Sequence, residues 1–392
     1  MSLPNRVGPP PLFPVLLSGI GAFLGLYATQ PILPVLEDAF HTSKVMVSLT
    51  VTVAGLGVAL AAPIAGQIAD RLGRKRVIVA SAFLLGLATL MNATAPTLPW
   101  LLFWRFLQGV ATPGVFAVTT AYVQEEFPPE RVAAGISAYI SGNTVGGFTG
   151  RLLSGFAAQH FGWRSAFVVI GLTALGIACY LALALPKETH FHRPEKPAGL
   201  IGPAWKHLSN PQLLASYGIG FCVLFSLIAM FTWVTFHLAA PPYSLGAGWL
   251  GSIFVAYLAG AVMTPIAGRR IDRLGHRPVL LAAAGLAIAG VALTLGPHLW
   301  MVMAGLAVGC SGVFISQASA TSYVSSSAKQ DRALAVGLYV TFYYTGGSMG
   351  AITPGWLWNS YGWPGCVALV IAVQLFIAAI AWTMWTPRGA HA

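Results

Sequence analysis

The sequence predicts an all-α membrane protein with twelve transmembrane helices in two pseudo-symmetric halves of six helices each. Three observations lead to this fold class. Charged residues make up only 8% of the chain, whereas soluble domains carry about a quarter to cover a water-facing surface. Apolar residues form blocks of about twenty, long enough to cross a hydrocarbon layer of about 30 Å. Two stretches of the first half recur in the second half, which indicates a duplicated bundle.

The apolar blocks, taken in chain order, define the spans. We expect the first six at 12–36, 46–69, 77–95, 99–123, 132–158 and 163–185, and the other six at 211–238, 245–268, 278–296, 299–325, 333–358 and 363–385. The longest polar stretch, 186–210, separates the two sets and is expected to be a solvent-exposed cytoplasmic linker. The predicted domains are therefore residues 1–185, the linker 186–210 and residues 211–392.

Basic residues gather on one side of these spans. If the N-terminus is cytoplasmic, the linker and the clusters at 66–77 and 269–277 face the cytoplasm, and only Lys44 and Arg164 lie in loops on the other side. The positive-inside rule then predicts cytoplasmic N- and C-termini in a bacterial inner membrane. A net charge of +11 would suggest nucleic acid as a partner of a soluble protein. Here we interpret it as a topology signal and expect no nucleic-acid partner.

The duplication is visible in two pairs of stretches. Residues 62–77 read APIAGQIADRLGRKRV and residues 264–279 read TPIAGRRIDRLGHRPV, at an offset of 202. At an offset of 200, residues 139–163 and 339–363 share one tyrosine, five glycines and a final tryptophan. Parallel repeats of this kind place a substrate site between two halves near the middle of the membrane.

These motifs resemble those of the major facilitator superfamily over essentially the whole chain. Residues 66–77 match its signature loop G-x-x-x-D-R-x-G-R-R/K-x, and Arg105-Phe-Leu-Gln108-Gly109 is similar to its fourth-helix R-x-x-Q-G motif. The fifth-span glycines resemble its antiporter motif, although Gly147 stands where that motif usually has proline. The stretch ISGNTVGGFTGR is similar to a subgroup described as sugar or drug efflux permeases.

The resemblance implies a secondary active transporter that moves a small organic solute by alternating access. We expect proton-coupled efflux, by a monomer with no cofactor, and the alternative is uptake or facilitated diffusion of an organic anion or sugar. An intramembrane enzyme would need a catalytic constellation at span depth, and an ATP-driven pump would need a G-x-x-x-x-G-K-[ST] loop. The sequence contains neither.

The 66–77 cluster predicts a cytoplasmic latch between the halves. Asp70 ends the second span, where a carboxylate can face the positive N-terminal end of a neighbouring helix, and the resemblance suggests the eleventh span. Arg74 can pair with Glu125 or Glu126 at the end of the fourth span. The expected latch comprises Gly66, Asp70, Arg71, Gly73, Arg74, Glu125 and Glu126, with Asp272 and Arg273 in a weaker mirror image. The alternative is a basic loop that only sets the topology.

Ionisable residues inside spans are costly and therefore candidates for function. Arg105 and Arg151 lie within the fourth and fifth spans, and the nearest acids are Glu37 and Asp38 at the outer end of the first. Three interpretations stay open. One acid pairs with one of the arginines and protonation releases the pair, or the arginines attract an anionic substrate, or both are structural and bond backbone carbonyls. Gln30 stands where many proton-coupled exporters of the resembled family place an acid, so coupling through a buried carboxylate is not supported.

Polar and aromatic side chains of spans one, four, five, seven, ten and eleven are candidates for substrate contact, and the resemblance implies that spans one, four, seven and ten line the cavity. They are Tyr27, Gln30, Arg105, Gln108, Asn143, Arg151, Trp233, Phe236, Gln317, Tyr339 and Tyr343. Gly142, Gly146 and Gly150 recur every four residues, which lets two helices approach closely. We expect their partner to be a helix of the other half, sealing the outer side. The four cysteines lack metal-ligand spacing, and no metal site is predicted.

Overall fold

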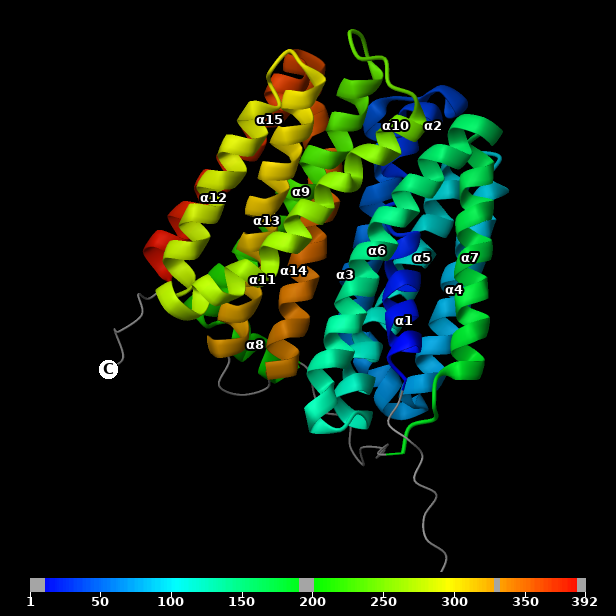
Figure 1. The fold of residues 1–392 in the computed structure, drawn as a ribbon, viewed down its shortest axis with the longest axis vertical. Helices are drawn as coiled ribbons and strands as arrows, with labels where there is room; N and C mark the ends of the chain where they lie inside the picture. The colour runs from blue at the N-terminus through cyan, green and yellow to red at the C-terminus, as the bar shows by residue number, and fades with distance from the viewer. Residues whose placement is uncertain (1–10, 190–200, 328–331, 386–392) are drawn as a thin grey trace, which may run out of the picture.

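The computed structural model describes residues 11–189, 201–327 and 332–385, whose helices form two bundles side by side (Figure 1). The first bundle contains α1 (Leu12–Leu24), η1 (Gln30–Ile32), α2 (Leu33–Phe40), α3 (Lys44–Leu72), α4 (Arg74–Ala93), α5 (Leu98–Glu126), α6 (Pro129–Phe161) and α7 (Trp163–Ala184). The second contains α9 (Pro211–Ala239), α10 (Ala247–Ser252), η2 (Ile253–Val255), α11 (Ala256–Leu274), α12 (His276–Leu293), α13 (Leu299–Ser327), α14 (Arg332–Ile352) and α15 (Pro354–Met384). A short helix, α8 (Ile201–Leu208), precedes the second bundle.

Each of the first ten predicted spans coincides with one of these helices or with a consecutive group of them, and the last two share α14 and α15. Within the described ranges, nine helices are long and apolar enough to cross a membrane, and none of the described residues forms a strand. The predicted class, an all-α membrane protein, is confirmed. Of the predicted linker, residues 190–200 lie outside the described residues.

Some predicted elements differ in detail from the structure. The first span is interrupted after Leu24, because Pro31 and Pro34 cannot donate backbone hydrogen bonds to a continuous helix. The eighth span is likewise divided, by η2. The eleventh ends at Ile352, and its predicted last residues begin α15 at Pro354. The predicted linker, 186–210, contains the short helix α8.

The duplicated glycines have matching backbone conformations. Gly73 and Gly275, at the ends of α3 and α11, have φ angles of 95° and 88°. Gly162 separates α6 from α7 with a φ of 81°, and Gly362 kinks α15 with a φ of 60°. A positive φ costs glycine little, because it has no Cβ. The repeated glycines therefore place the same sharp reversals in both halves.

The two bundles touch each other at the end of the molecule opposite residues 66–77, which we call the closed end. There the backbone N–H of Gly248 in α10 donates to Gln159 Oε1 of α6 at 2.7 Å, and a Cβ on Gly155 would collide with the Ala247 carbonyl oxygen. In Figure 1, α10 lies against α6 at the upper end, and α11 leads away from α6 toward the lower end.

Contacts between α3 and α14 likewise decrease toward residues 66–77. Thr52 Oγ1 donates to the Ser348 carbonyl oxygen at 3.0 Å, and Thr341 Oγ1 donates to that of Ala59 at 3.3 Å. One turn or more further along each helix, a Cβ on Gly66 or Gly337 would meet no atom within 4 Å. The halves therefore separate toward the end that carries residues 66–77, which we call the charged end.

Candidate functional site

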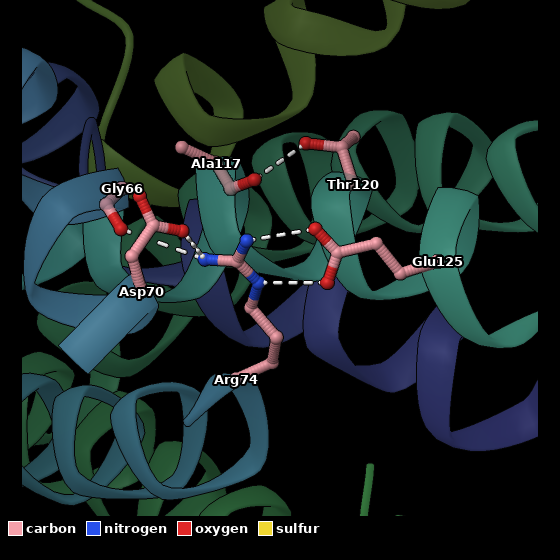
Figure 2. Close-up of polar contacts among 6 residues, drawn as sticks. All are labelled: Gly66, Asp70, Arg74, Ala117, Thr120 and Glu125. Atoms are coloured by element: carbon pink, nitrogen blue, oxygen red, sulfur yellow. Dashed lines mark hydrogen bonds and ion pairs between the residues drawn. The ribbon is translucent and has the colours of Figure 1, made fainter. Parts of the chain in front are cut away.

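A charged cluster lies at the ends of α3, α4 and α5 (Figure 2). The Arg74 guanidinium binds both oxygens of Glu125, with Nε–Oε2 and Nη2–Oε1 distances of 3.0 and 2.7 Å. Its Nη1 lies 2.6 Å from Asp70 Oδ1 and donates to the Gly66 carbonyl oxygen at 3.5 Å. The Arg74 side chain is only 12% exposed, so this two-pronged pairing is held in a fixed geometry.

All of these contacts of Arg74 lie within the first bundle, and they are intact while the charged end is open. The predicted pairing of Arg74 with Glu125 is thus present. Both residues belong to the first half, so the pair does not itself join the halves, and its part in a latch stays a prediction. Arg71, Asp272 and Arg273 are exposed at the same end. Closure by Asp70 against α14 stays a prediction, because the side chains at the start of α14, residues 332 and 333, lie outside the described residues.

The beginning of the linker is attached to the same cluster, which the sequence did not reveal. Glu188 Oε2 accepts the backbone N–H of Lys75 at 3.3 Å, so a carboxylate lies at the positive N-terminal end of α4. Thr189 donates its backbone N–H and its hydroxyl to Glu126 Oε2, at 2.9 and 2.7 Å. The linker start is thus bound to α4 and α5.

Arg105 is fully buried, and it donates hydrogen bonds to backbone carbonyls that follow the end of α1, where the first span is interrupted. Its Nε donates to the Thr50 carbonyl oxygen at 3.0 Å and its Nη1 to that of Gly25 at 2.8 Å. It also donates to the Leu26 carbonyl oxygen and to Gln108 Oε1. Carbonyls at a helix C-terminus have no partner within the helix, and a cation there is favourable. These contacts agree with the structural interpretation of Arg105.

Arg151 lies at the junction of the two bundles and is 3% exposed. Its Nε donates to Gln30 Oε1 at 2.8 Å, its Nη1 to the Gly147 carbonyl oxygen at 2.7 Å, and its Nη2 reaches the Tyr257 hydroxyl at 3.5 Å. Gln30 Nε2 then donates to Thr232 Oγ1 of α9 at 3.0 Å. This network, from Arg151 through Gln30 to Thr232 and directly to Tyr257, joins the two halves.

Three aromatic rings surround the same guanidinium. The Arg151 Cζ atom lies 5.1 Å from the ring centre of Tyr27 and 4.7 Å from those of Phe254 and Tyr257. Such cation–π contacts stabilise a desolvated cation by about 2 kcal/mol each. Among the described residues, the groups in contact with Arg151 are thus neutral oxygens and rings.

The predicted pairs between the outer acids and the arginines are not present in the structure. Glu37 Oε1 is instead 2.8 Å from Lys44 Nζ, and Asp38 is exposed. The sequence could not show this preference, because α2 bends the outer end of the first span toward the start of α3.

The other candidate substrate contacts are distributed along the interior. Tyr27, Gln108, Trp233, Phe236, Tyr339 and Tyr343 are buried, and Asn143 and Gln317 are partly exposed. Trp233 donates to the Ala351 carbonyl oxygen at 2.9 Å and packs on Phe236, with ring centres 5.4 Å apart. It belongs to the packing of the closed end. Tyr339 and Tyr343 stack with ring centres 5.8 Å apart.

The partner predicted for the fifth-span glycines is wrong. A Cβ on Gly142, Gly146 or Gly150 would collide with the carbonyl oxygens of successive turns of α1, a helix of the same half. Spacing every four residues predicts a close approach but does not identify the approaching helix. Gly155, outside that motif, makes the close contact with the other half.

A groove of about 360 Å³ lies between α3, α4 and α5. It is almost wholly apolar, with Ile64, Val77 and Val110 among its lining residues. It lies within the first bundle and contains none of the predicted substrate contacts, so we do not identify it as the substrate site.

Sequence reasoning missed several residues of the central network. Thr232, Phe254 and Tyr257 were not singled out, because they lie on helices whose facing side the apolar pattern does not reveal. Thr50, which accepts a hydrogen bond from Arg105, was missed because it contributes only a backbone carbonyl.

Comparisons with known proteins agree with this architecture. The profile of the Major Facilitator Superfamily matches residues 15–246 and 226–392. The inner membrane transport protein YnfM of Escherichia coli is 33% identical over 370 residues, which cover 93% of this chain and 88% of that relative. The MFS-type transporter YybF of Bacillus subtilis is 30% identical over 364 residues, covering 93% and 90%.

Solved structures show the same fold. A bacterial homologue of the human lysosomal transporter Spinster, inward-facing and unoccupied, aligns with a TM-score of 0.77 at 16% identity, over 96% of this chain and 98% of that one. A mutant of the nucleoside transporter NupG aligns with a TM-score of 0.76 at 12% identity, over 96% and 100%.

Proposed function

Because this chain belongs to the Major Facilitator Superfamily, we propose that it exports a small organic solute across the bacterial inner membrane by alternating access, in exchange for protons. Membership makes it an integral membrane transporter with a small-molecule substrate rather than an enzyme. Efflux, proton exchange, cytoplasmic termini and a monomeric state are our proposals.

The observation that carries the proposal is the asymmetry of the interface between the halves. Hydrogen bonds join the bundles at the closed end, while the faces of α3 and α14 diverge past Gly66 and Gly337. The positive-inside rule assigns the charged end to the cytoplasm. An opening on that side is where an exported solute would load.

For proton exchange, we propose Glu37 as the proton-binding group. It pairs with Lys44 at 2.8 Å, and the Lys44 ammonium lies 5.7 Å from the ring centre of Phe236 in the other half. Protonation of Glu37 would remove the charge that holds Lys44 in this place. The bridge between halves at the closed end would then weaken, so that a proton bound from outside favours opening of that end.

The test is transport by purified protein in liposomes with an imposed pH gradient, using a panel of organic solutes. We expect a solute to move against its gradient only when protons flow the other way. Glu37→Gln should abolish the dependence on the pH gradient, whereas Asp38→Asn, a change at the exposed neighbouring acid, should keep it. Gradient-driven transport of equal rate in Glu37→Gln would contradict the assignment of the proton to Glu37.

A further inference from the structure

We propose that Arg151 binds the carboxylate of the transported solute, so that the substrate class is organic anions with an apolar body. This inference rests on the proposed transport function and specifies its substrate.

The two arginines differ in how many donors they have left. A guanidinium carries five N–H groups. Arg105 directs its nitrogens at three backbone carbonyls and Gln108, which leaves one N–H for a ligand. Arg151 makes three hydrogen bonds, and the one to Tyr257 is long at 3.5 Å. One N–H group therefore remains on each of its two η nitrogens.

Among the described residues, no acidic side chain pairs with Arg151. Buried charges in proteins are normally paired or bound to counterions, and charged groups within a membrane are costly. The acids of the described residues lie near the ends of helices or in the linker, from Glu37 and Asp38 at the closed end to Asp70 and Asp272 at the charged end. The contacts of Arg151 within those residues are neutral. A carboxylate ligand would provide the missing negative charge through a two-pronged bond.

The surroundings define the rest of the ligand. Rings of Tyr27, Phe254 and Tyr257 cover the guanidinium, and Phe314 meets Tyr257 with ring centres 5.8 Å apart. Tyr257 is partly exposed, whereas Arg151 is not. A ligand that displaces the long Arg151–Tyr257 bond therefore reaches the edge of the guanidinium between aromatic walls, which favour an apolar or aromatic body.

Because Arg151 lies between the two halves, a bound anion would affect how the halves are connected. Arg151 belongs to α6 of the first half, whereas Tyr257 and Phe254 belong to the second. A carboxylate that replaces the tyrosine contact changes the connection between halves at the point where they must separate. Binding and reorientation would thus involve the same bonds.

The probes are benzoate and hexanoate, with benzamide and hexanamide as uncharged molecules of the same shape. Protein purified in detergent is titrated with each probe, and the thermal unfolding temperature is recorded. We expect the acids, and not the amides, to raise the unfolding temperature of the wild type. Arg151→Gln should weaken acid binding at least about tenfold, as the loss of a charge-assisted bond predicts. Arg277→Gln, at an arginine over the Trp382 ring, is the matched control and should bind normally.

A second variant keeps Arg151 and tests the same site in case Arg151→Gln does not fold. Tyr257→Phe removes the phenol hydroxyl that competes for Nη2, so it should bind benzoate at least as tightly as the wild type. Equal effects of acids and amides, no effect of any acid, or full binding by Arg151→Gln would each overturn the inference. Acid binding without transport of any solute in liposomes would instead contradict the proposed function. Transport of uncharged solutes alone would contradict only the anion site.

Discussion

Replacement of Arg105 by methionine tests whether this buried arginine holds the interrupted first span together. The change keeps the length of an apolar side chain and removes every donor. The Leu26 carbonyl oxygen and Gln108 Oε1 then lose the partner described above. The Gly25 carbonyl oxygen keeps the Ala28 N–H at 3.3 Å, and the Thr50 carbonyl lies inside α3, so these two lose a second hydrogen bond only. The interruption of the first span, which exposes the Leu26 carbonyl, remains.

The magnitude follows from the number of groups left unpaired. A buried polar group without a partner costs about 1–3 kcal/mol, and relief from burying the guanidinium charge offsets part of the sum. For the two groups that lose their partner, we expect a net loss of about 3 kcal/mol. For a chain of 392 residues, the entropy of unfolding is about 0.8 kcal/mol/K, so the unfolding temperature should fall by about 4 °C.

The assay is thermal unfolding of purified protein in detergent, followed by tryptophan fluorescence. Arg105→Lys keeps the charge but places its three donors at one point, and should lose about half as much. Arg277→Met, at an arginine outside the network, should shift the unfolding temperature by less than about 1 °C. If Arg105→Met unfolds within 1 °C of the wild type yet loses transport, Arg105 contacts substrate and the structural reasoning is refuted.

Three further changes have defined outcomes. Gly146→Leu should prevent correct packing of α6 on α1 and lower the yield of folded protein severalfold, as measured by size-exclusion chromatography. The control is Gly218→Leu, where a Cβ would meet one atom of the described residues, at 3.9 Å, and the yield should stay unchanged. Equal yields of the two variants would contradict the close approach of α6 and α1. Glu125→Gln should reduce the stability by only about 1 kcal/mol, because Glu125 is 39% exposed, but should alter the transport rate; a loss of several kcal/mol in denaturant unfolding would show that the cluster is mainly structural. Glu188→Ala removes the acceptor of the Lys75 N–H and should loosen the linker start, which raises its rate of cleavage by trypsin. An unchanged rate would argue against this attachment.

The spans could be predicted because membrane helices must satisfy their own backbone hydrogen bonds in lipid, so each appears as one apolar block. The repeat likewise indicated a duplicated bundle, and its equivalent glycines Gly73 and Gly275 follow α3 and α11 in the structure. Interruptions were harder to predict. Gly25, Pro31 and Pro34 signal a weak helix, but only the burial of Arg105 against the freed carbonyls shows where the first span ends.

The interaction partners of the predicted residues were the part of the site that was hardest to predict from the sequence. Arg151 was identified from its cost in the membrane, yet its neighbours Phe254 and Tyr257 depend on how the second half is rotated against the first. Glu37 was expected to approach an arginine, and α2 brings it to Lys44 instead. Sequence spacing identifies the chemistry of a side chain, whereas its partner depends on the packing of helices far apart in the chain.

The close pairing of α1 with α6 has a consequence for how the protein is made. Both helices, and the others that they touch in the first bundle, precede residue 190, so their contacts can form as soon as α7 has left the ribosome and entered the membrane. The first bundle can then complete its helix packing before the second bundle is synthesised. Two separately synthesised pieces, divided within 190–200, should therefore find each other in the bilayer and restore transport.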